Sequence, residues 1–267
     1  QTGSYYMGGS IQGVSLPVRY DYPALRQTPR QLRDYFASCG WTRIAAFQAA
    51  NPLNRMEQEM AQRIAEERAL KLLIHPLVAM THVDDTEYFN RVRCYQKTLG
   101  QLPAQNTALA LLPLVARGAG LRDVLWHGII HRNYGCSHFI VENICEAGKY
   151  TASRQRLDEL HDRVLSYQDI LGLEIMPLPS GSGVRDYHTL KLHNEVTQTT
   201  ESQGLSDSEF RQRLIHGMDI PERCSFPQVI DELRRFYPTK DRQGFTVFFT
   251  GLSGAGKSTL AKILLGQ

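Results

Sequence analysis

Short apolar runs that alternate with longer amphipathic stretches are the feature that most limits the fold of this chain. The runs that resemble strands lie at 43–48, 72–78, 108–112, 137–141 and 173–176, and helical periodicity is found at 29–39, 54–70, 85–98, 120–133 and 154–169. Apolar strands separated by helices indicate a parallel sheet that is covered on both faces. We therefore predict an α/β fold whose ligands bind beyond the carboxyl ends of the strands.

The sequence changes character after residue 177, where loop-forming residues become frequent. Two short helices are predicted near 206–216 and 225–236, and Ser225 is suited to be the N-cap of the second. We therefore predict a small α-rich subdomain, with its linker, at 181–240.

A phosphate-binding loop lies near the carboxyl end. Residues 251–258 read GLSGAGKS, a complete GxxxxGK[ST] motif, and they stand between a β-rich apolar run and a helical run. The glycines of such a loop let backbone N–H groups surround a polyphosphate, Lys257 reaches the β- and γ-phosphates, and the Ser258 hydroxyl binds Mg²⁺. We therefore predict that ATP and Mg²⁺ bind here. The predicted nucleotide-binding residues are Gly251, Leu252, Ser253, Gly254, Ala255, Gly256, Lys257, Ser258 and Thr259.

The sequence after this loop is short. Only eight residues follow Thr259, whereas a P-loop kinase needs further strands, a Walker B carboxylate and an acceptor site. The chain also begins at Gln1 in a segment rich in Gly, Tyr and Ser. We expect the natural polypeptide to be longer in both directions, and the 267-residue chain to be incomplete as a kinase.

Charge and cysteine content argue against several classes of protein. The formal net charge is +3 and the basic residues are scattered, so neither a nucleic-acid-binding stripe nor a membrane anchor is indicated. The five cysteines include no CxxC pair, which favours buried free thiols in a reducing cytoplasm over a zinc site or disulfides. The longest apolar stretch, at 108–116, is too short to span a bilayer. Small anionic molecules remain the expected partners.

Two parts of the sequence resemble known enzymes. The segment QGFTVFFTGLSGAGKSTLA resembles the opening of adenylylsulfate (APS) kinases, which phosphorylate adenylylsulfate with MgATP. The region before it is similar to sulfate adenylyltransferase (ATP sulfurylase), which occurs fused to that kinase in a bacterial bifunctional type. Six blocks match this family in order: GGSIQGVSLPVRYDYP, FQAANPLNRMEQEM, IHPLVAMTHVDD, RVRCYQ, WHGIIHRNYGCSHFIV and IPERCSFPQVIDELRRFYP.

The resemblance implies an order of domains. Residues 1–25 would be the tail of a largely missing amino-terminal β domain, and 26–180 a Rossmann-like nucleotidylyltransferase domain. Residues 181–240 would be the small subdomain and linker, and 241–267 the start of a P-loop adenylylsulfate kinase domain. Relatives of this kind form oligomers, so the resemblance also implies a homo-oligomer.

The sulfurylase-like region differs from its family at residues that carry charge. Active sulfurylases have a QxRNPxHxxH motif, whose Arg and two His hold sulfate and the phosphates of ATP. In the corresponding residues 48–57, Ala50 replaces the Arg, and Asn54 and Glu57 replace the two His. The site therefore lacks the cations that the family motif implies, and Glu57 adds a negative charge.

Other family blocks are altered as well. A second family motif, GRDHAGPG, corresponds to 142–148, where its Arg, Asp and His are absent and Asn143 and Cys145 are among the residues present. In the HPLVGxTK block, Ala79 replaces the Gly and His82 replaces the Lys. The loss of charged groups is thus spread over more than one motif.

The expected size of these changes decides their interpretation. Loss of one preorganised donor to a developing oxyanion typically costs about 10²- to 10³-fold in rate. A carboxylate such as Glu57 at roughly 4 Å from an anionic group would oppose it by up to about 4 kcal/mol at an effective dielectric constant of about 20. We therefore predict that the sulfurylase-like site is catalytically inactive.

Three functions remain open from the sequence. The first is an adenylylsulfate kinase in the full-length protein, with the sulfurylase-like region as a scaffold. The second is a bifunctional enzyme with an active sulfate adenylyltransferase. The third is a non-catalytic module that binds a nucleotide and regulates the protein.

A few other residues have two interpretations. His75 either contacts a nucleotide, as the resemblance implies, or is a structural histidine in a turn. Arg91 and Arg93 face an anion or lie on a solvated helix face with ion pairs. His127 and His131 are four residues apart on one helix, a spacing that can bind metal, but no third ligand is evident and we expect no metal site.

Overall fold

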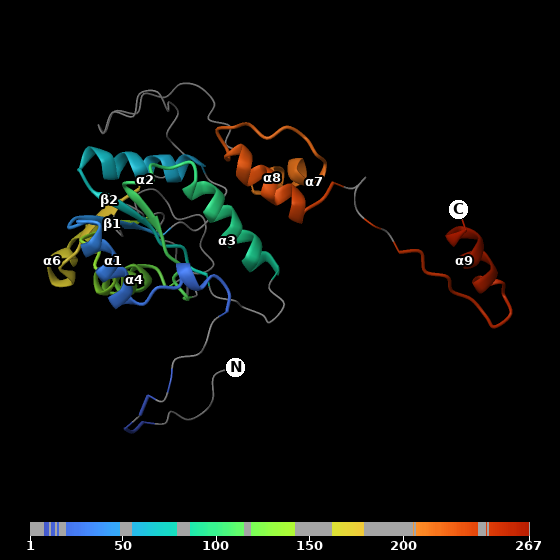
Figure 1. Ribbon diagram of the computed structural model, residues 1–267, viewed down its shortest axis with the longest axis horizontal. Coiled ribbons are helices and arrows are strands. Elements are labelled where there is room, and N and C mark those ends of the chain that lie inside the picture. The colour runs from blue at the N-terminus through green and yellow to red at the C-terminus, as the bar shows by residue number, and fades with distance from the viewer. Residues whose placement is uncertain are drawn as a thin grey trace.

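The computed structural model describes residues 8–10, 12–13, 15, 20–48, 55–78, 86–114, 119–141, 162–178, 205, 207–239, 244 and 246–266. At its centre is a parallel sheet with the strand order β3-β2-β1-β4-β5 (Figure 1). The strands are β1 (Ile44–Phe47), β2 (Lys71–Ile74), β3 (Thr107–Leu109), β4 (His138–Val141) and β5 (Glu174–Pro177). The predicted α/β fold with a parallel sheet is confirmed.

Helices connect the strands and continue beyond them. Their bounds are η1 (Pro23–Leu25), α1 (Pro29–Ser38), α2 (Arg55–Glu67), α3 (Thr86–Leu99), α4 (Leu121–Asn133), α6 (Gln168–Leu171), α7 (Asp207–Ile215), α8 (Pro227–Phe236) and α9 (Lys257–Leu265). The helix predicted at 154–169 lies partly outside the described residues; within them, 162–165 are helical and a turn at 166–167 precedes α6. None of the described helices has both the length and the apolarity needed to cross a membrane.

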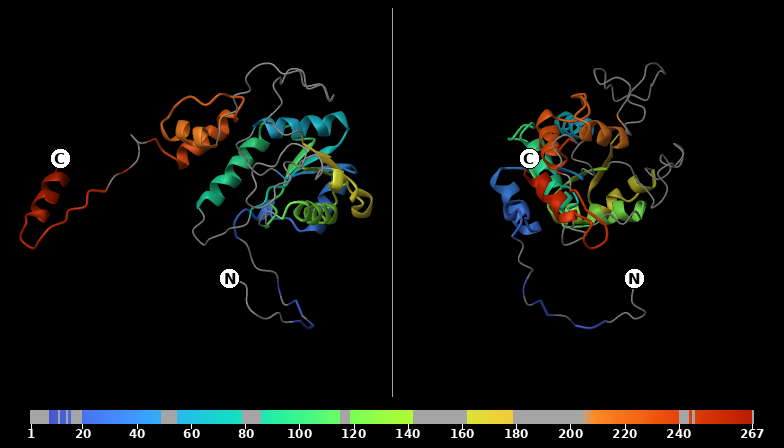
Figure 2. Two further views of the ribbon diagram at one scale, coloured as in Figure 1. Left: turned by 180° about the vertical axis from the view of Figure 1, so that it is seen from behind. Right: turned by 90° about the vertical axis from the view of Figure 1, so that its right-hand side faces the viewer.

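The sheet is buried on both faces, which explains why its strands are continuously apolar. On β1, Ile44 and Ala46 pack in one cluster with side chains of α1 and α4, whereas Ala45 and Phe47 pack in another with side chains of α2 and α3. Successive residues of a strand point to opposite faces, so each of the four is enclosed by helices of one side. The views in Figure 1 and Figure 2 show these two helical layers on either side of the sheet.

Helices α7 and α8 form a small helical unit that packs on α3. Its apolar cluster includes Val229, Ile230 and Leu233 of α8 together with Cys94 of α3. The buried carboxylate of Glu232 lies 3.6 Å from a guanidinium nitrogen of Arg93 on α3. The unit is therefore joined to the sheet-bearing part by apolar packing and by an ion pair.

The beginnings of α1 and α8 show two different ways to start a helix. Thr28 and Gln31 form a reciprocal capping box, and Pro29 occupies the first turn of α1. The predicted N-cap Ser225 of α8 is wrong, because the N-cap is Phe226 and no described group hydrogen-bonds the buried Ser225 hydroxyl. The fixed ring of Pro227 keeps Phe226 extended, which delays the start of the helix by one residue.

Four cysteines lie in the described residues, and all are free thiols. Cys94 and Cys136 are buried, as predicted, whereas Cys224 is half-buried and Cys39 is exposed. Burial, and secondarily the charge of Glu232, raises the pKa of the Cys94 thiol to about 12. The prediction that the thiols are buried is thus wrong for Cys39.

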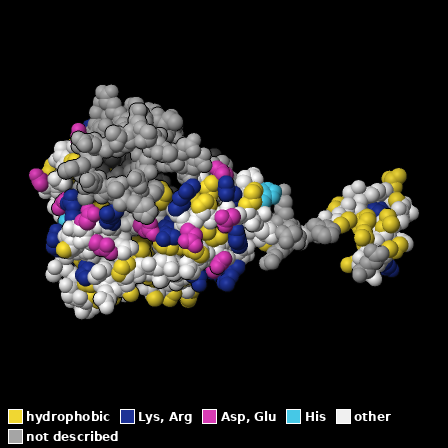
Figure 3. All heavy atoms as spheres, turned by 90° about the horizontal axis from the view of Figure 1, so that it is seen from above, with side chains coloured by type: hydrophobic (Ala, Val, Ile, Leu, Met, Phe, Trp, Pro, Cys, Tyr) yellow, Lys and Arg dark blue, Asp and Glu magenta, His cyan; other side chains and the backbone are white. Residues whose placement is uncertain are grey.

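The stretch 246–266 lies apart from the sheet in Figure 1 and Figure 2, and none of the described residues of α9 is buried. Residues 246–250, expected to be a strand, form neither a strand nor a helix. A strand requires a neighbour with which to pair, and Val247 and Phe248 are instead exposed. Figure 3 shows hydrophobic side chains gathered over this stretch, in contrast to the mixed charges of the larger part.

Candidate functional site

The strand order places two loops of the chain at the same edge of the sheet. Along the strand order, the chain proceeds from β1 to β2 in one direction and from β4 to β5 in the opposite direction. The direction therefore reverses between the adjacent strands β1 and β4. Phe47 is aligned with Ile140 in the register of this pair, so the segments after Phe47 and after Val141 leave the sheet side by side. A crevice at such a reversal, beyond the carboxyl ends of the strands, is where open α/β sheets bind ligands.

Both altered family motifs follow these two strands. Residues 49–54 and 142–161 lie outside the described residues, so the positions of Ala50, Asn54, Asn143 and Cys145 are not given by the structure. What the structure establishes is where their segments begin, at the carboxyl ends of β1 and β4. The sequence itself shows that the family's Arg and His are absent from these segments.

Glu57 is the one altered motif position that the structure describes. It lies in the first turn of α2 and is half-buried. A carboxylate there stabilises the helix because the amino-terminal end of a helix carries partial positive charge. The same carboxylate offsets the attraction of that helix end for an anion, so the start of α2 is less suited to hold a phosphate than its backbone alone would be.

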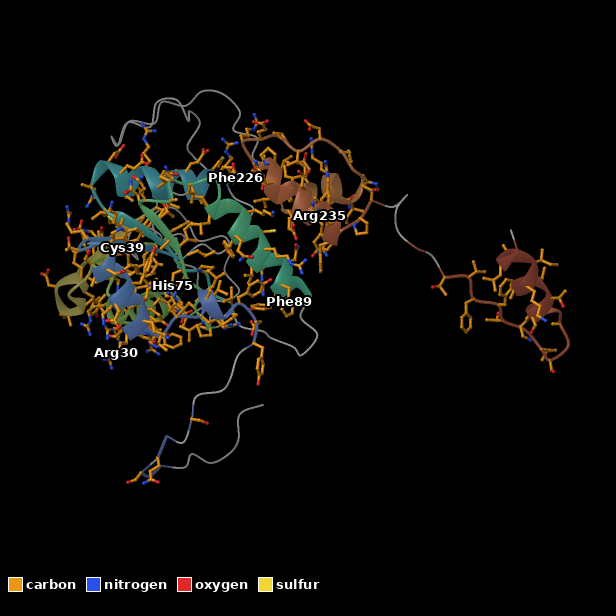
Figure 4. The ribbon with its side chains drawn as sticks, viewed as in Figure 1. Arg30, Cys39, His75, Phe89, Phe226 and Arg235 are labelled. Carbon is orange, nitrogen blue, oxygen red and sulfur yellow. The ribbon has the colours of Figure 1, made fainter. Side chains whose placement is uncertain are left out.

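His75 is a core residue. It directly follows β2 and its side chain is fully buried, as Figure 4 shows inside the sheet-bearing part. Its Nδ1 lies 3.2 Å from Nδ1 of His131 on α4, and its ring meets that of Tyr134 edge to face with centroids 4.7 Å apart. Burial lowers the pKa of His75 to about 3, so the ring is neutral. Of the two interpretations of His75, the described structure favours the structural one.

The two histidines of α4 serve the core in the same way. His131 is fully buried, and burial, followed by the proximity of His75 and His127, holds its pKa well below the usual value. Burial also lowers the pKa of His127, and the nearby Asp123 partly opposes this effect. The described part of the chain contains no group of three or more His, Cys, Asp or Glu residues able to hold a metal ion.

Arg91 and Arg93 both lie on α3, and Arg91 is half-buried. The Arg93 side chain is 59% exposed and pairs with Glu232 of α8. For Arg93, this arrangement matches the interpretation of a solvated helix face with ion pairs.

The phosphate-binding loop has the local backbone that its sequence requires. Gly251, Gly254 and Gly256 have φ angles of 146°, 82° and 78°, in a region that side chains disfavour. Gly256 is the N-cap of α9, so the helix begins at Lys257, and the Lys257 ammonium donates to the carbonyl oxygens of Gly251 and Leu252 at 2.9 and 2.7 Å. The loop thus surrounds the Lys257 ammonium and leads directly into the first turn of α9. A loop followed by a helix start is the arrangement found in polyphosphate sites.

Two features of these regions were not foreseen from the sequence. One is the His75–His131 contact, and the other is a set of contacts from Arg55, at the start of α2, to residues before α8. The residues in each pair are far apart in the chain and no local pattern links them. Only the tertiary fold brings them together.

Comparison with known proteins identifies the family of the sheet-bearing part. The family model described as ATP-sulfurylase matches residues 23–236. Two similar curated proteins are sulfate adenylyltransferases. That of Mycosarcoma maydis is 39% identical over 264 residues, which are 98% of this chain and 46% of the relative. That of Phaeosphaeria nodorum is 38% identical over 263 residues, which are 97% of this chain and 46% of the relative.

A solved structure with similar fold is described as a hexameric APS kinase from Thiobacillus denitrificans. It is 38% identical, with a TM-score of 0.77, and the match covers 97% of this chain and 49% of that chain. The chain thus spans about half the length of the relatives it matches. The resemblance stated from the sequence blocks is confirmed: by a family match over most of its length, and by an α/β fold shared with its relatives, this chain belongs to the ATP-sulfurylase family.

Proposed function

We propose that the full-length protein is an adenylylsulfate kinase in which the sulfurylase-like region is a non-catalytic scaffold. The observation that carries this proposal is a contrast within one chain. The phosphate-binding loop at 251–258 retains each residue that its chemistry requires, whereas the motif at 48–57 lacks the Arg and both His of its family. The solved relative that matches 97% of this chain bears the name of the kinase, which supports the same proposal.

In the proposed reaction, the 3′-hydroxyl oxygen of adenylylsulfate bonds to the γ-phosphorus of ATP. The bond from that phosphorus to the β,γ-bridging oxygen breaks, ADP leaves, and the hydroxyl proton passes to a base or to solvent. The chain's own part is to hold the phosphates with the backbone N–H groups of the loop and with Lys257. The positive-φ glycines and the hydroxyl of Ser258 fit ATP with Mg²⁺, which would neutralise phosphate charge when bound.

Binding of ATP also requires Lys257 to change partners. The Lys257 ammonium donates hydrogen bonds to two carbonyl oxygens of the loop, which satisfies two of its three N–H donors. A polyphosphate offers the same ammonium stronger, charged acceptors. We therefore expect Lys257 to be indispensable for nucleotide binding.

A second candidate is an active sulfate adenylyltransferase. The names of the curated relatives favour it, because proteins 38% and 39% identical over nearly the whole chain are called sulfate adenylyltransferases. Against it stand the missing cations at 48–57 and 142–148 and the carboxylate of Glu57. The two candidates differ in a measurable reaction, since only the second forms ATP from adenylylsulfate and pyrophosphate.

We also propose that the protein is a homo-oligomer in a reducing cytoplasm, with ATP and adenylylsulfate as its small-molecule partners. The solved relative is described as hexameric, which supports an oligomer. Among the described residues on the face shown in Figure 3, Lys and Arg side chains are interspersed with Asp and Glu, and this mixed charge supports small-molecule partners.

The test is a pair of assays on the full-length protein, one for adenylylsulfate phosphorylation with MgATP and one for ATP formation from adenylylsulfate and pyrophosphate. We expect the first activity and not the second. Lys257→Ala should lower the kinase activity by at least about 10²-fold, because it removes the cation that meets the phosphates. Lys262→Ala, on the exposed part of the same helix, is the matched control and should retain it.

Two results would contradict the proposal. A full-length protein without kinase activity would refute the kinase, and robust pyrophosphate-dependent ATP formation would refute the inactive scaffold and support the second candidate. Calorimetry with adenylylsulfate on residues 1–240 alone, which lack the phosphate-binding loop, separates a third alternative. Binding heat from this region, without ATP formation from adenylylsulfate and pyrophosphate, would indicate a regulatory nucleotide site in the sulfurylase-like region.

A further inference from the structure

Arg55 binds the segment that precedes α8. It is the first residue of α2 and directly follows the loop with the altered family motif. Its backbone N–H donates to the carbonyl oxygen of Cys224 at 3.3 Å, and its Nη1 donates to the carbonyl oxygen of Glu222 at 3.1 Å. The guanidinium carbon also lies 4.8 Å from the centre of the Phe226 ring. One residue of the sheet-bearing part thus holds three positions of the helical unit.

The chemistry of Arg55 suits this position. Its Nε donates to Glu59 one turn along α2 at 2.7 Å, which orients the guanidinium while Nη1 remains directed at the Glu222 carbonyl. A planar guanidinium can donate from several edges and stack on an aromatic face at the same time, whereas an ammonium cannot. The ring of Phe226 is buried, and Figure 4 shows this residue where α8 approaches α2 and α3.

The backbone contact closes the amino-terminal end of α2. The first N–H groups of a helix have no partner within the helix and are available to an anion. Here the N–H of Arg55 donates to the Cys224 carbonyl. The segment 222–226 therefore already occupies part of the helix end that follows the altered motif.

We propose that Arg55 is a latch, by which we mean a residue whose contacts fix the segment 222–226 to the start of α2. Arg55 lies in the carboxyl-terminal part of the altered motif, so this part of the motif has a structural role in place of a catalytic one. Through this latch the helical unit limits access of anions to the start of α2. Because α8 leads on to the phosphate-binding stretch, the latch also fixes one end of the connection to that stretch. The inference goes beyond the proposed kinase activity and does not depend on it.

The latch and the packing of α8 on α3 share one residue, Phe226. Most of the apolar cluster between the two parts is formed by other side chains, among them Val229, Ile230 and Leu233 of α8 and Cys94 of α3. Loss of the latch should therefore loosen the segment before α8 and the first turn of α2, and leave the α3–α8 packing and the sheet in place.

Hydrogen–deuterium exchange followed by mass spectrometry on the 267-residue chain tests this inference. In Arg55→Ala, amides at 218–228 and in the first turn of α2 should exchange about tenfold faster, as expected for loss of a charge-assisted hydrogen bond and a cation–π contact. Arg63→Ala is the matched control, because Arg63 forms the same i,i+4 pair on α2, with Glu67. It should leave the exchange of both segments unchanged.

Arg55→Lys provides a second variant that keeps the positive charge near Glu59. It should raise exchange in the same two segments by a smaller factor, since an ammonium cannot both stack on Phe226 and reach the Glu222 carbonyl. The latch is refuted by wild-type exchange at 218–228 in both Arg55 variants. It is equally refuted by an increase that Arg63→Ala reproduces, or by one that extends uniformly over the strands.

Discussion

Acidification should lower the free energy of unfolding of this protein, because His75 and His131 are buried in the core. His75 is fully buried, with its Nδ1 3.2 Å from that of His131, and burial lowers its pKa to about 3. In the unfolded chain, His75 would regain an ordinary pKa of about 6.5. Because the unfolded state then binds more protons than the folded state, the free energy of unfolding rises with pH, and falls as the pH drops from about 6.5 towards 3.

The magnitude follows from these two pKa values. At pH 5 the unfolded His75 is protonated and the folded one is not, so 1.5 pH units at about 1.4 kcal/mol per unit give a loss of about 2 kcal/mol. His131, whose pKa is also held well below the usual value by burial, adds to the loss in the same direction. In the hydrogen bond between the two Nδ1 atoms, one carries the proton and the other must be unprotonated to accept it. At most one of the two rings can therefore be doubly protonated while this contact persists.

The assay is urea unfolding at several pH values between 8 and 5, on the wild-type chain and on His75→Asn. The asparagine amide places a polar atom near the former Nδ1 but does not titrate. The variant should be less stable at pH 8, yet lose about 2 kcal/mol less than the wild type between pH 8 and 5. His216→Asn is the control, because His216 is exposed, and it should retain the wild-type difference. An unchanged pH difference in His75→Asn would refute the reasoning.

Three further results are expected from the structure. Thr28→Ala should lower the free energy of unfolding by about 1 kcal/mol, measured by urea unfolding, because it removes the side chain that caps α1. Gly135→Ala should cost at least about 1 kcal/mol in the same assay, since Gly135 has a φ of 95° and an added Cβ would lie 2.7 Å from Cγ of Arg33. A thiol reagent applied to the folded chain, with the labelled peptides identified by mass spectrometry, should modify the exposed Cys39 rapidly; the buried Cys136, whose pKa is raised by burial, should react only after unfolding.

Much of the fold could be predicted from the sequence because its elements are specified locally. Each of the five strands predicted for the sheet overlaps an observed strand, and their ends differ by at most four residues. The predicted run 72–78 is longer than β2, which ends at Ile74. Pro76 has no N–H to donate, and beyond it only an isolated bridge between Leu77 and Leu112 continues the pairing. Val78 is nevertheless buried, so the hydrophobic pattern indicated burial rather than strand length.

The long-range contacts could not be predicted, because no local pattern encodes them. His75 follows β2 and meets His131 only because α4 packs against the face of the sheet that carries Leu73 of β2. The same holds for the contact of Arg55 with the segment before α8, since Glu222 follows Arg55 by 167 residues. For the same reason the i,i+4 spacing of His127 and His131 did not indicate that both side chains are buried in the core.

The residues that form the sheet are not the residues of the altered family motifs. A sulfurylase-like region can therefore keep its fold without the charged groups of those motifs. The strands β1 and β4 are held by side chains buried on both faces, and none of the altered motif positions lies within either strand. The cations that the family motifs imply are therefore not part of either strand. Their loss changes the charge beyond the carboxyl ends of β1 and β4, and the removal of one preorganised donor alone typically costs about 10²- to 10³-fold in rate. A chain can thus keep the fold and the family match of a sulfurylase while the charges that follow its strands differ from those of the family motif.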